Sequence, residues 1–256
     1  GISHFDLKTN KFDHVPKAFL NPSASVRSIS QGPDGQIWFA VENEGLFYTD
    51  QSGSQMRELE LYSSETGASK VTDVVDIEID EGGELWLSTL SHGIVKLNPK
   101  TRTYSFITSE ILGASAQPLE TYASAFDHEG QLWIGASDGL YILSEDEQEL
   151  ERLSTDNSGL PDDQIFSIYH TEQGLVWAGT YSGLAKGTPS IFATVSAQDG
   201  LPSDSTNAFT QTEDGTLWIA TDGGIASMPP FTPSDSNSSN VTPASFDLPA
   251  SRIMSL

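Results

Sequence analysis

The chain alternates short apolar stretches with polar turns that contain glycine. Stretches such as Val74 to Ile79 and Ile165 to Tyr169 are partly alternating and rich in β-branched residues, a composition typical of β-strands near a packed centre. Each is followed within a few residues by a turn that ends in glycine, and glycine readily adopts the positive φ of a tight hairpin. The pattern predicts strands joined by hairpins.

The tryptophans show that these hairpins repeat. Each follows a glycine by three positions and precedes an apolar residue and then a small one; six or seven positions after it comes glycine with Leu or Ile. The set is Trp38, Trp86, Trp133, Trp177 and Trp218, with spacings of 48, 47, 44 and 41 residues. Gly1-Ile2 matches the last element of the same repeat. A period of this length indicates a propeller or another repeat architecture.

Each repeat can supply four antiparallel strands. The apolar stretch before the turn is the first strand, the segment around Trp is the second, and the later glycine begins the third, as in Gly45 to Tyr48. A short segment such as Thr103 to Ile107 can serve as the fourth. Four strands in about 45 residues make a propeller blade. We therefore expect an all-β β-propeller in which each Trp fills the space between blades and the small residue after it allows close approach.

Composition narrows the function but names no partner. The formal charge is −24, from 36 acidic and 12 basic residues, which disfavours nucleic acid because its binding depends on neutralising phosphates. A solvated surface explains the acidity. The absence of cysteine excludes disulfides, thiolate zinc sites and cysteine nucleophiles. No apolar run reaches the roughly 18 residues of a membrane helix.

The later repeats resemble a known family, the two-component regulator propeller repeat. Leu201-Pro202 leads through residues 214–221, Asp-Gly-Thr-Leu-Trp-Ile-Ala-Thr, to Gly223-Gly224-Ile225, and Leu160-Pro161 leads in the same way to Trp177. The first two repeats lack Leu-Pro. The resemblance implies a seven-bladed propeller that serves as the extracytoplasmic input module of a membrane-anchored histidine kinase, hybrid regulator or diguanylate cyclase. In some family members the inducer is a glycan fragment.

The repeats predict one partial propeller over residues 1–256. Full blades are expected at 17–63, 64–110, 111–155, 156–196 and 197–246, the last with a low-complexity insertion at 229–244. Residues 1–16 read as the end of a blade and 247–256 as the start of the next, as in an excerpt from a larger propeller.

A ligand is expected where the loops between second and third strands meet the loops between blades. In a propeller both kinds of loop emerge on one face, and variation among equivalent loops on a constant scaffold can create a specific site. A sugar or polyol needs planar apolar surface with donors and acceptors around it. Tyr122 is assigned to a loop between blades. The candidate ligand-binding residues are His92, Tyr181, Tyr122, Asp138, Glu44 and Asp222. The alternative is that each is simply an exposed residue of a solvated loop and binds no ligand.

Catalytic chemistry is not expected. Gly135 to Gly139 matches the Gly-x-Ser-x-Gly nucleophile elbow, but that motif needs a turn from strand to helix, and here it joins two strands. The repeats also resemble those of streptogramin lyases, which need histidine, carboxylate and metal at one channel mouth. The five histidines are predicted to scatter, with only His92 on the ligand face. No metal, cofactor or catalytic residue is therefore assigned.

The resulting hypothesis is a non-catalytic ligand-binding sensor domain of a bacterial signal-transduction protein. The expected partner is a small molecule or oligosaccharide, with a homodimer as a candidate assembly. The expected location is periplasmic or extracellular, with attachment to a membrane only through other segments. The alternatives are a protein-interaction propeller and a streptogramin lyase-like enzyme.

Overall fold

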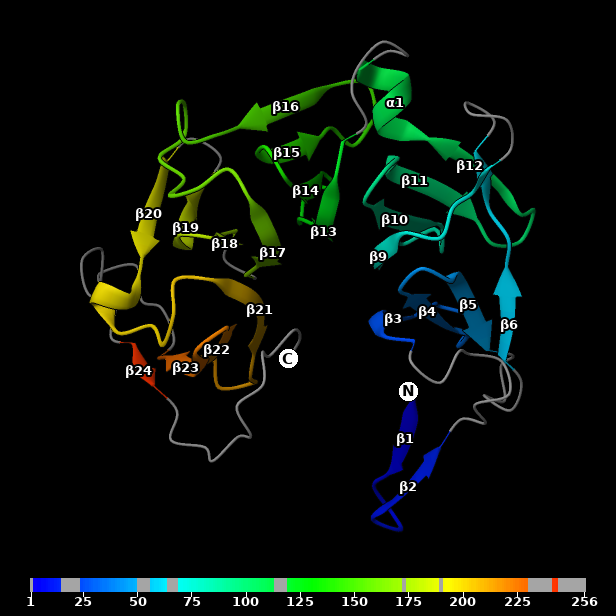
Figure 1. The fold of residues 1–256 in the computed structure, drawn as a ribbon, viewed down its shortest axis with the longest axis horizontal. Helices are drawn as coiled ribbons and strands as arrows, with labels where there is room; N and C mark the ends of the chain where they lie inside the picture. The colour runs from blue at the N-terminus through cyan, green and yellow to red at the C-terminus, as the bar shows by residue number, and fades with distance from the viewer. Residues whose placement is uncertain are drawn as a thin grey trace. The chain divides into compact units, whose positions relative to one another are not determined.

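The computed structural model describes residues 2–14, 24–49, 56–63, 69–112, 119–171, 174–188, 191–229 and 241–243. They belong to two compact units, Gly1–Glu120 and Thr121–Leu256, which are described separately. The described structure is dominated by five four-stranded sheets (Figure 1). In every sheet the strands follow chain order and pair antiparallel. This confirms the predicted β-propeller built from four-stranded blades.

The first unit contains two of these blades, numbered here in chain order. Blade 1 consists of β3 (Val26–Gln31), β4 (Ile37–Val41), β5 (Gly45–Thr49) and β6 (Met56–Leu59). Blade 2 consists of β9 (Val74–Ile79), β10 (Leu85–Thr89), β11 (Gly93–Asn98) and β12 (Thr103–Phe106). Two smaller pairs accompany them, β1 (Ser3–Asp6) with β2 (Lys11–His14) and β7 (Tyr62–Ser63) with β8 (Ser69–Lys70).

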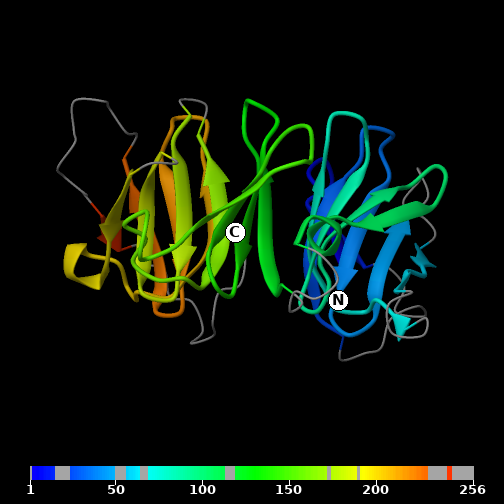
Figure 2. The same cartoon turned by 90° about the horizontal axis from the view of Figure 1, so that it is seen from above.

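The second unit contains three blades. Blade 3 consists of β13 (Thr121–Phe126), β14 (Leu132–Ala136), β15 (Leu140–Leu143) and β16 (Leu150–Leu153). Blade 4 consists of β17 (Ile165–His170), β18 (Val176–Thr180), β19 (Gly183–Thr188) and β20 (Ile191–Val195). Blade 5 consists of β21 (Thr206–Gln211), β22 (Leu217–Thr221), β23 (Gly224–Met228) and β24 (Thr242–Pro243). The first strands β13, β17 and β21 line one side of this unit, and its sheets stand face to face (Figures 1 and 2).

Three of the tryptophans, Trp38, Trp133 and Trp177, fill the space between neighbouring blades, as their spacing predicts. Trp38 packs with Val74 and Ile77 of the next blade. In the second unit Trp133 packs with Ile165, and Trp177 packs in the same way against blade 5. Burying one such ring removes a large apolar surface from water. Trp218 departs from the pattern because it is only partly buried.

In blades 2 and 3 an aspartate six positions before Trp holds the hairpin turn between the first and second strands. Asp127 accepts the indole N–H of Trp133 at 2.8 Å and the backbone N–H of Gln131 at 2.9 Å. Asp80 makes the same two kinds of bond in blade 2. The glycines three positions before each Trp have φ between 77° and 84°, the left-handed region in which a side chain is disfavoured. The glycine of all five turns and the aspartate of the turns in blades 2 and 3 therefore have a structural cause.

The small residue two positions after Trp allows the close approach that the sequence predicts. A Cβ atom on Gly135 would lie 2.6 Å from the carbonyl oxygen of Ile165 in blade 4. A Cβ on Gly179 would lie 2.8 Å from both Phe209 Cζ and the Thr206 carbonyl oxygen in blade 5. These separations are too short for real Cβ atoms, and so only glycine fits.

One expected strand is shorter than predicted. Strand β12 ends at Phe106, and helix α1 (Ile107–Leu112) begins at Ile107, which the pattern assigns to the strand. The hydroxyl of Thr108 accepts the backbone N–H of Ile94 at 3.2 Å, which ties the helix to β11. The segment predicted to start another blade, 247–256, lies outside the described residues, as does most of the predicted insertion. None of the described helices is long and apolar enough to cross a membrane.

Candidate functional site

Backbone hydrogen bonds join the two kinds of loop that were expected to form the ligand face. In four blades the N–H of the residue four positions after Trp donates to a carbonyl in the loop that leads into the blade. The pairs are Glu42 to Ser25, Leu90 to Asp73, Tyr181 to Gln164 and Asp222 to Ser205, at 2.9 to 3.3 Å. The scaffold therefore places these loops side by side within each of these four blades.

Side chains reinforce this junction. In blade 4 the Ser182 hydroxyl donates to Asp162 Oδ2 at 2.7 Å. In blade 5 the Asn207 amide donates to Asp222 Oδ1 at 2.9 Å. These bonds fix the carboxylates in place, so that their remaining lone pairs point in defined directions. Asp222 is exposed at the surface.

His92 belongs to a small polar cluster in blade 2. The Ser91 hydroxyl lies 2.9 Å from His92 Nδ1 and also donates to Asp73 Oδ2, while Asp73 Oδ1 lies 3.7 Å from the same ring nitrogen. The ring also packs on Phe106, with centroids 5.5 Å apart. The serine hydroxyl and the aspartate carboxylate thus lie near the same ring nitrogen, Nδ1. A nucleophilic triad needs them on opposite nitrogens of the imidazole, and so this cluster is not arranged as one.

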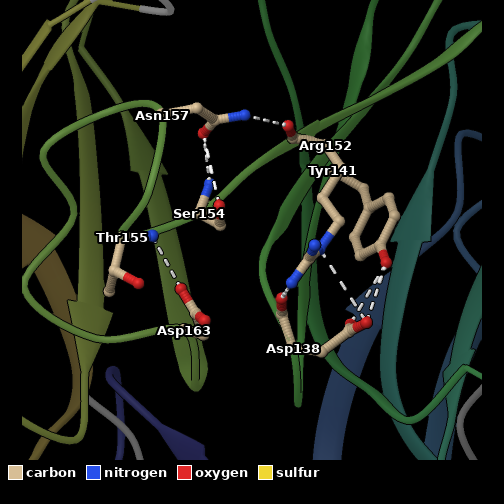
Figure 3. A network of polar contacts seen from close by, with 7 residues as sticks. All are labelled: Asp138, Tyr141, Arg152, Ser154, Thr155, Asn157 and Asp163. Carbon is tan, nitrogen blue, oxygen red and sulfur yellow. Dashed lines mark hydrogen bonds and ion pairs between the residues drawn. The ribbon is translucent and has the colours of Figure 1, made fainter.

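Asp138 in blade 3 is engaged by its own blade (Figure 3). Its two carboxylate oxygens accept the Tyr141 hydroxyl at 3.2 and 3.1 Å, and Arg152 Nε lies 3.8 Å from Oδ2. Arg152 Nε also donates to the Asp138 carbonyl at 2.9 Å. Burial, with the charge of Asp138 adding to it, raises the pKa of Tyr141 to about 12. Tyr141 therefore remains a neutral donor, and it occupies part of the acceptor capacity of Asp138.

The loop between blades 3 and 4 is ordered by its own polar residues, which Figure 3 shows beside Asp138. The Asn157 side chain accepts the Ser154 backbone N–H at 2.7 Å, and its amide donates to the Arg152 carbonyl at 3.0 Å. Asp163 accepts the Thr155 backbone N–H at 2.7 Å. Because Asp163 is used in this way, it fixes the loop that carries Asp162.

Tyr122 lies in strand β13, not in the loop before it as expected. The pairing of β13 with β14 shifts register between Thr121 and Ala123, which makes Tyr122 the extra residue of a β-bulge. Its ring contacts the ring of Phe166 in blade 4, with centroids 5.4 Å apart and planes at 45°. Both side chains are partly exposed. The structure thus forms an aromatic pair across two blades, and the sequence reasoning missed its second member.

The six predicted residues divide between the units. His92 and Glu44 belong to the first unit, and Glu44 lies half-buried in a turn whose N–H donates to Val41 at 3.0 Å. The other four belong to the second unit, where Tyr181 is the most exposed of the described aromatic residues at 60%. Phe166 and Asn207 were not predicted. Each stands eleven residues before a Trp, as Tyr122 does, and this constant spacing is the signal that could have found them.

Among the described residues, no three His, Asp or Glu side chains come together in an arrangement that could hold a metal ion.

Comparison with known proteins identifies the repeats. Residues 159–182 and 200–223 match the two component regulator propeller family; these segments run from the loop before blade 4 or blade 5 to the loop after its second strand. No match was found among curated proteins.

Solved structures share the fold. An extracellular domain assigned to a hybrid two component system of B. thetaiotaomicron aligns with 88% of this chain and 28% of its own, at TM-score 0.69 and 23% identity. A second such domain from this bacterium aligns with 91% and 30%, at TM-score 0.72 and 19% identity. Virginiamycin B lyase from Staphylococcus aureus aligns with 97% and 78%, at TM-score 0.72 and 13% identity.

These identities establish the fold alone, and the chain spans less than a third of the length of the two component system domains. The family assignment rests on the repeats of blades 4 and 5. The chain is a β-propeller that carries two component regulator propeller repeats.

Proposed function

We propose that this chain is a non-catalytic ligand-binding sensor region of a bacterial signal-transduction protein, placed outside the cytoplasm. The observation that carries the proposal is the second unit, where side chains suited to binding stand on hydrogen-bonded loops and at strand bulges. They are the exposed Tyr181, the Tyr122–Phe166 pair and Asp222. The family match and the extracellular neighbours support the sensor role and the location.

The ligand that suits this surface is a small polyhydroxylated molecule or an oligosaccharide. Aromatic rings offer flat apolar area to the face of a sugar ring, while a fixed carboxylate accepts hydroxyl protons. The net charge of −24 favours a neutral or cationic ligand over a strongly anionic one.

A binding role fits the chemistry better than a catalytic one. The Gly-x-Ser-x-Gly run at 135–139 joins β14 to β15, so its serine lies at a hairpin and not at a strand-to-helix elbow. In the Ser91–His92–Asp73 cluster the hydroxyl and the carboxylate compete for one nitrogen. A sensor needs only that the ligand bind one arrangement of blades or subunits more tightly than another, because that difference shifts the equilibrium.

Isothermal calorimetry against a panel of neutral and acidic oligosaccharides of two to eight units tests the proposal. We expect at least one member to bind, and binding to weaken at least tenfold in Tyr181→Ala while the control Glu129→Ala, in a hairpin turn, retains it. A native chain that binds no member of the panel would contradict the proposed ligand class. Turnover of any panel member would contradict the non-catalytic role.

A further inference from the structure

We propose that ligand specificity in this propeller is set by two positions in each blade: the residue eleven before Trp and the residue four after it. They are called here the bulge position and the loop position. The inference rests on the proposed function and adds to it by naming the positions that discriminate between ligands. The observations behind it are a repeated β-bulge, its constant neighbours and the contacts between the side chains that vary.

A bulge recurs at the same place in all five blades. The pairing between the first and second strands shifts register there each time and leaves one extra residue on the first strand. The extra residues are Arg27, Val75, Tyr122, Phe166 and Asn207. Bulges are found next to functional sites because they re-aim a side chain. Because the bulge occurs at the same position in all five blades, it is a regular feature of this scaffold.

The residues beside the bulge hardly vary. Just before it, a β-branched residue pairs with a β-branched or small residue at the end of the second strand, and every member except Val26 is buried. The pairs are Val26–Val41, Val74–Thr89, Thr121–Ala136, Ile165–Thr180 and Thr206–Thr221. In contrast, the bulge position holds a cation, an aliphatic residue, two aromatics and an amide.

The loop position varies as widely on an equally fixed backbone. It holds Glu42, Leu90, Ser137, Tyr181 and Asp222. In four of these blades its N–H donates to the loop that leads into the blade, as described above. A constant backbone with a changing side chain is how a repeat fold presents different chemistry from blade to blade.

Side chains at these positions meet one another in the second unit. The bulge residues of blades 3 and 4 are in ring contact, Tyr122 with Phe166 at 5.4 Å. In blade 5 the bulge residue Asn207 donates to the loop residue Asp222 at 2.9 Å. The first strands of blades 4 and 5 are also in contact. An aromatic pair and a fixed carboxylate therefore occur on three adjacent blades.

This arrangement assigns roles. Tyr122 and Phe166 supply ring surface for the flat face of a ligand, and Asp222 accepts a hydroxyl proton. Asn207 is itself buried and acts as a positioning residue that orients Asp222. Tyr181, at the loop position of blade 4, is exposed. It determines which further parts of the ligand can extend from the bound sugar ring.

The test compares substitutions at the two positions with matched controls, using the oligosaccharide panel named above. Phe166→Ala is expected to weaken the best-bound member at least tenfold, while Phe166→Tyr retains binding within threefold. Tyr181→Ser, which copies the loop residue of blade 3, is expected to change the ranking of the panel members. The controls Glu129→Ala and Glu213→Ala change exposed residues of first-to-second turns and are expected to leave both affinity and ranking unchanged.

Three results would count against the inference, and they differ in what they leave standing. The first is that the native chain binds a panel member and that Phe166→Ala and Tyr181→Ser, both with native circular dichroism, bind it equally well. That result would contradict the two-position assignment and leave the sensor proposal standing. No binding by the native chain would remove the proposed function and this assignment together. A control substitution as damaging as Phe166→Ala would also count against the assignment.

Discussion

Blades 2 and 4 follow one backbone plan but differ at equivalent positions. Two residues after Trp, blade 2 has Ser88 and blade 4 has Gly179. Eight residues before Trp, blade 2 has Glu78, whereas blade 4 has Tyr169, whose hydroxyl donates to Gln211 at 2.9 Å. In blade 4 the next residue is His170, whose Nε2 is buried without a hydrogen-bond partner among the described residues. The turns and the Trp positions therefore maintain the shared backbone arrangement. Each blade accommodates one ionisable group in an unfavourable environment, Glu78 in blade 2 and His170 in blade 4.

The pKa values of the two groups are shifted in opposite directions. Burial, with the charge of Asp76 adding to it, raises the pKa of Glu78 to about 8 against a weaker opposing hydrogen bond from Ile79. Burial, aided by His128 and opposed by Asp127, lowers the pKa of His170 to about 4. Both groups are neutral in the folded chain near pH 6. The comparison thus teaches that the two blades limit stability at opposite ends of the pH scale.

The largest expected effect follows from a substitution two residues after Trp, where blades 2 and 4 differ. Replacing Gly179 with the residue of blade 2, Gly179→Ser, is expected to lower the free energy of unfolding by about 3 kcal/mol or more, because its Cβ would press on Phe209 and the Thr206 carbonyl of blade 5. The reciprocal Ser88→Gly should cost only about 1 kcal/mol. Urea unfolding measures both, and equal losses in the two variants would show that packing between blades is not the cause.

The next effect concerns Glu78. The unfolded carboxyl ionises near pH 4.5 and the folded one near 8, and so the group makes no difference below pH 4.5 and progressively costs stability as the pH rises through 8. Glu78→Gln is expected to stabilise the chain by about 2 to 3 kcal/mol at pH 9, since partial solvent contact reduces the full effect, and by nothing at pH 4. Thermal unfolding from pH 4 to 9 tests this. Glu129→Gln serves as the exposed control, and a difference between Glu78→Gln and the native chain that does not change with pH would refute the explanation.

The smallest effect concerns His170 and appears in acid. Its Nε2 is buried without a hydrogen-bond partner among the described residues, and its ring stands edge-on to Trp133 at 5.1 Å. The unfolded imidazole takes up a proton near pH 6.5 and the folded one near 4, so that stability is lost as the pH falls between these values. His170→Phe keeps the ring and removes the proton site.

We expect His170→Phe to gain about 1 to 2 kcal/mol over the native chain at pH 4, after allowance for partial exposure, and little at pH 7.5. Unfolding of the native chain, His170→Phe and His92→Asn across this range provides the measurement. An acid-dependent gain of the same size in His92→Asn would contradict the assignment to His170.

The sequence predicted the fold because the elements of the repeat are local. A turn glycine, Trp and a small residue fall within six positions of one another, and each has one physical reason for its place. Helix α1 was missed because Thr108 is held by Ile94 through a hydrogen bond that spans 14 residues, and no local pattern records it. The unfavourable environments of Glu78 and His170 depend on packing and were equally hidden.

The candidate site was predicted less completely for a different reason. Tyr181 and Asp222 were found because loops are where variation is sought. Phe166 and Asn207 were missed because they lie in strands that were assigned to the core. Only the observed pairing shows that these strands contain an extra residue at this point.

That extra residue has a consequence for how such a protein can change. A residue in a regular ladder faces a partner across the strands, and exchanging it alters a pair. A bulged residue has no such partner, and so Phe166 could be replaced without disturbing the pair of Ile165 with Thr180 beside it. Mutations there leave the neighbouring pairs of the strand ladder in place. One scaffold can therefore drift from ligand to ligand by single substitutions, and an engineer could retarget it at the same positions.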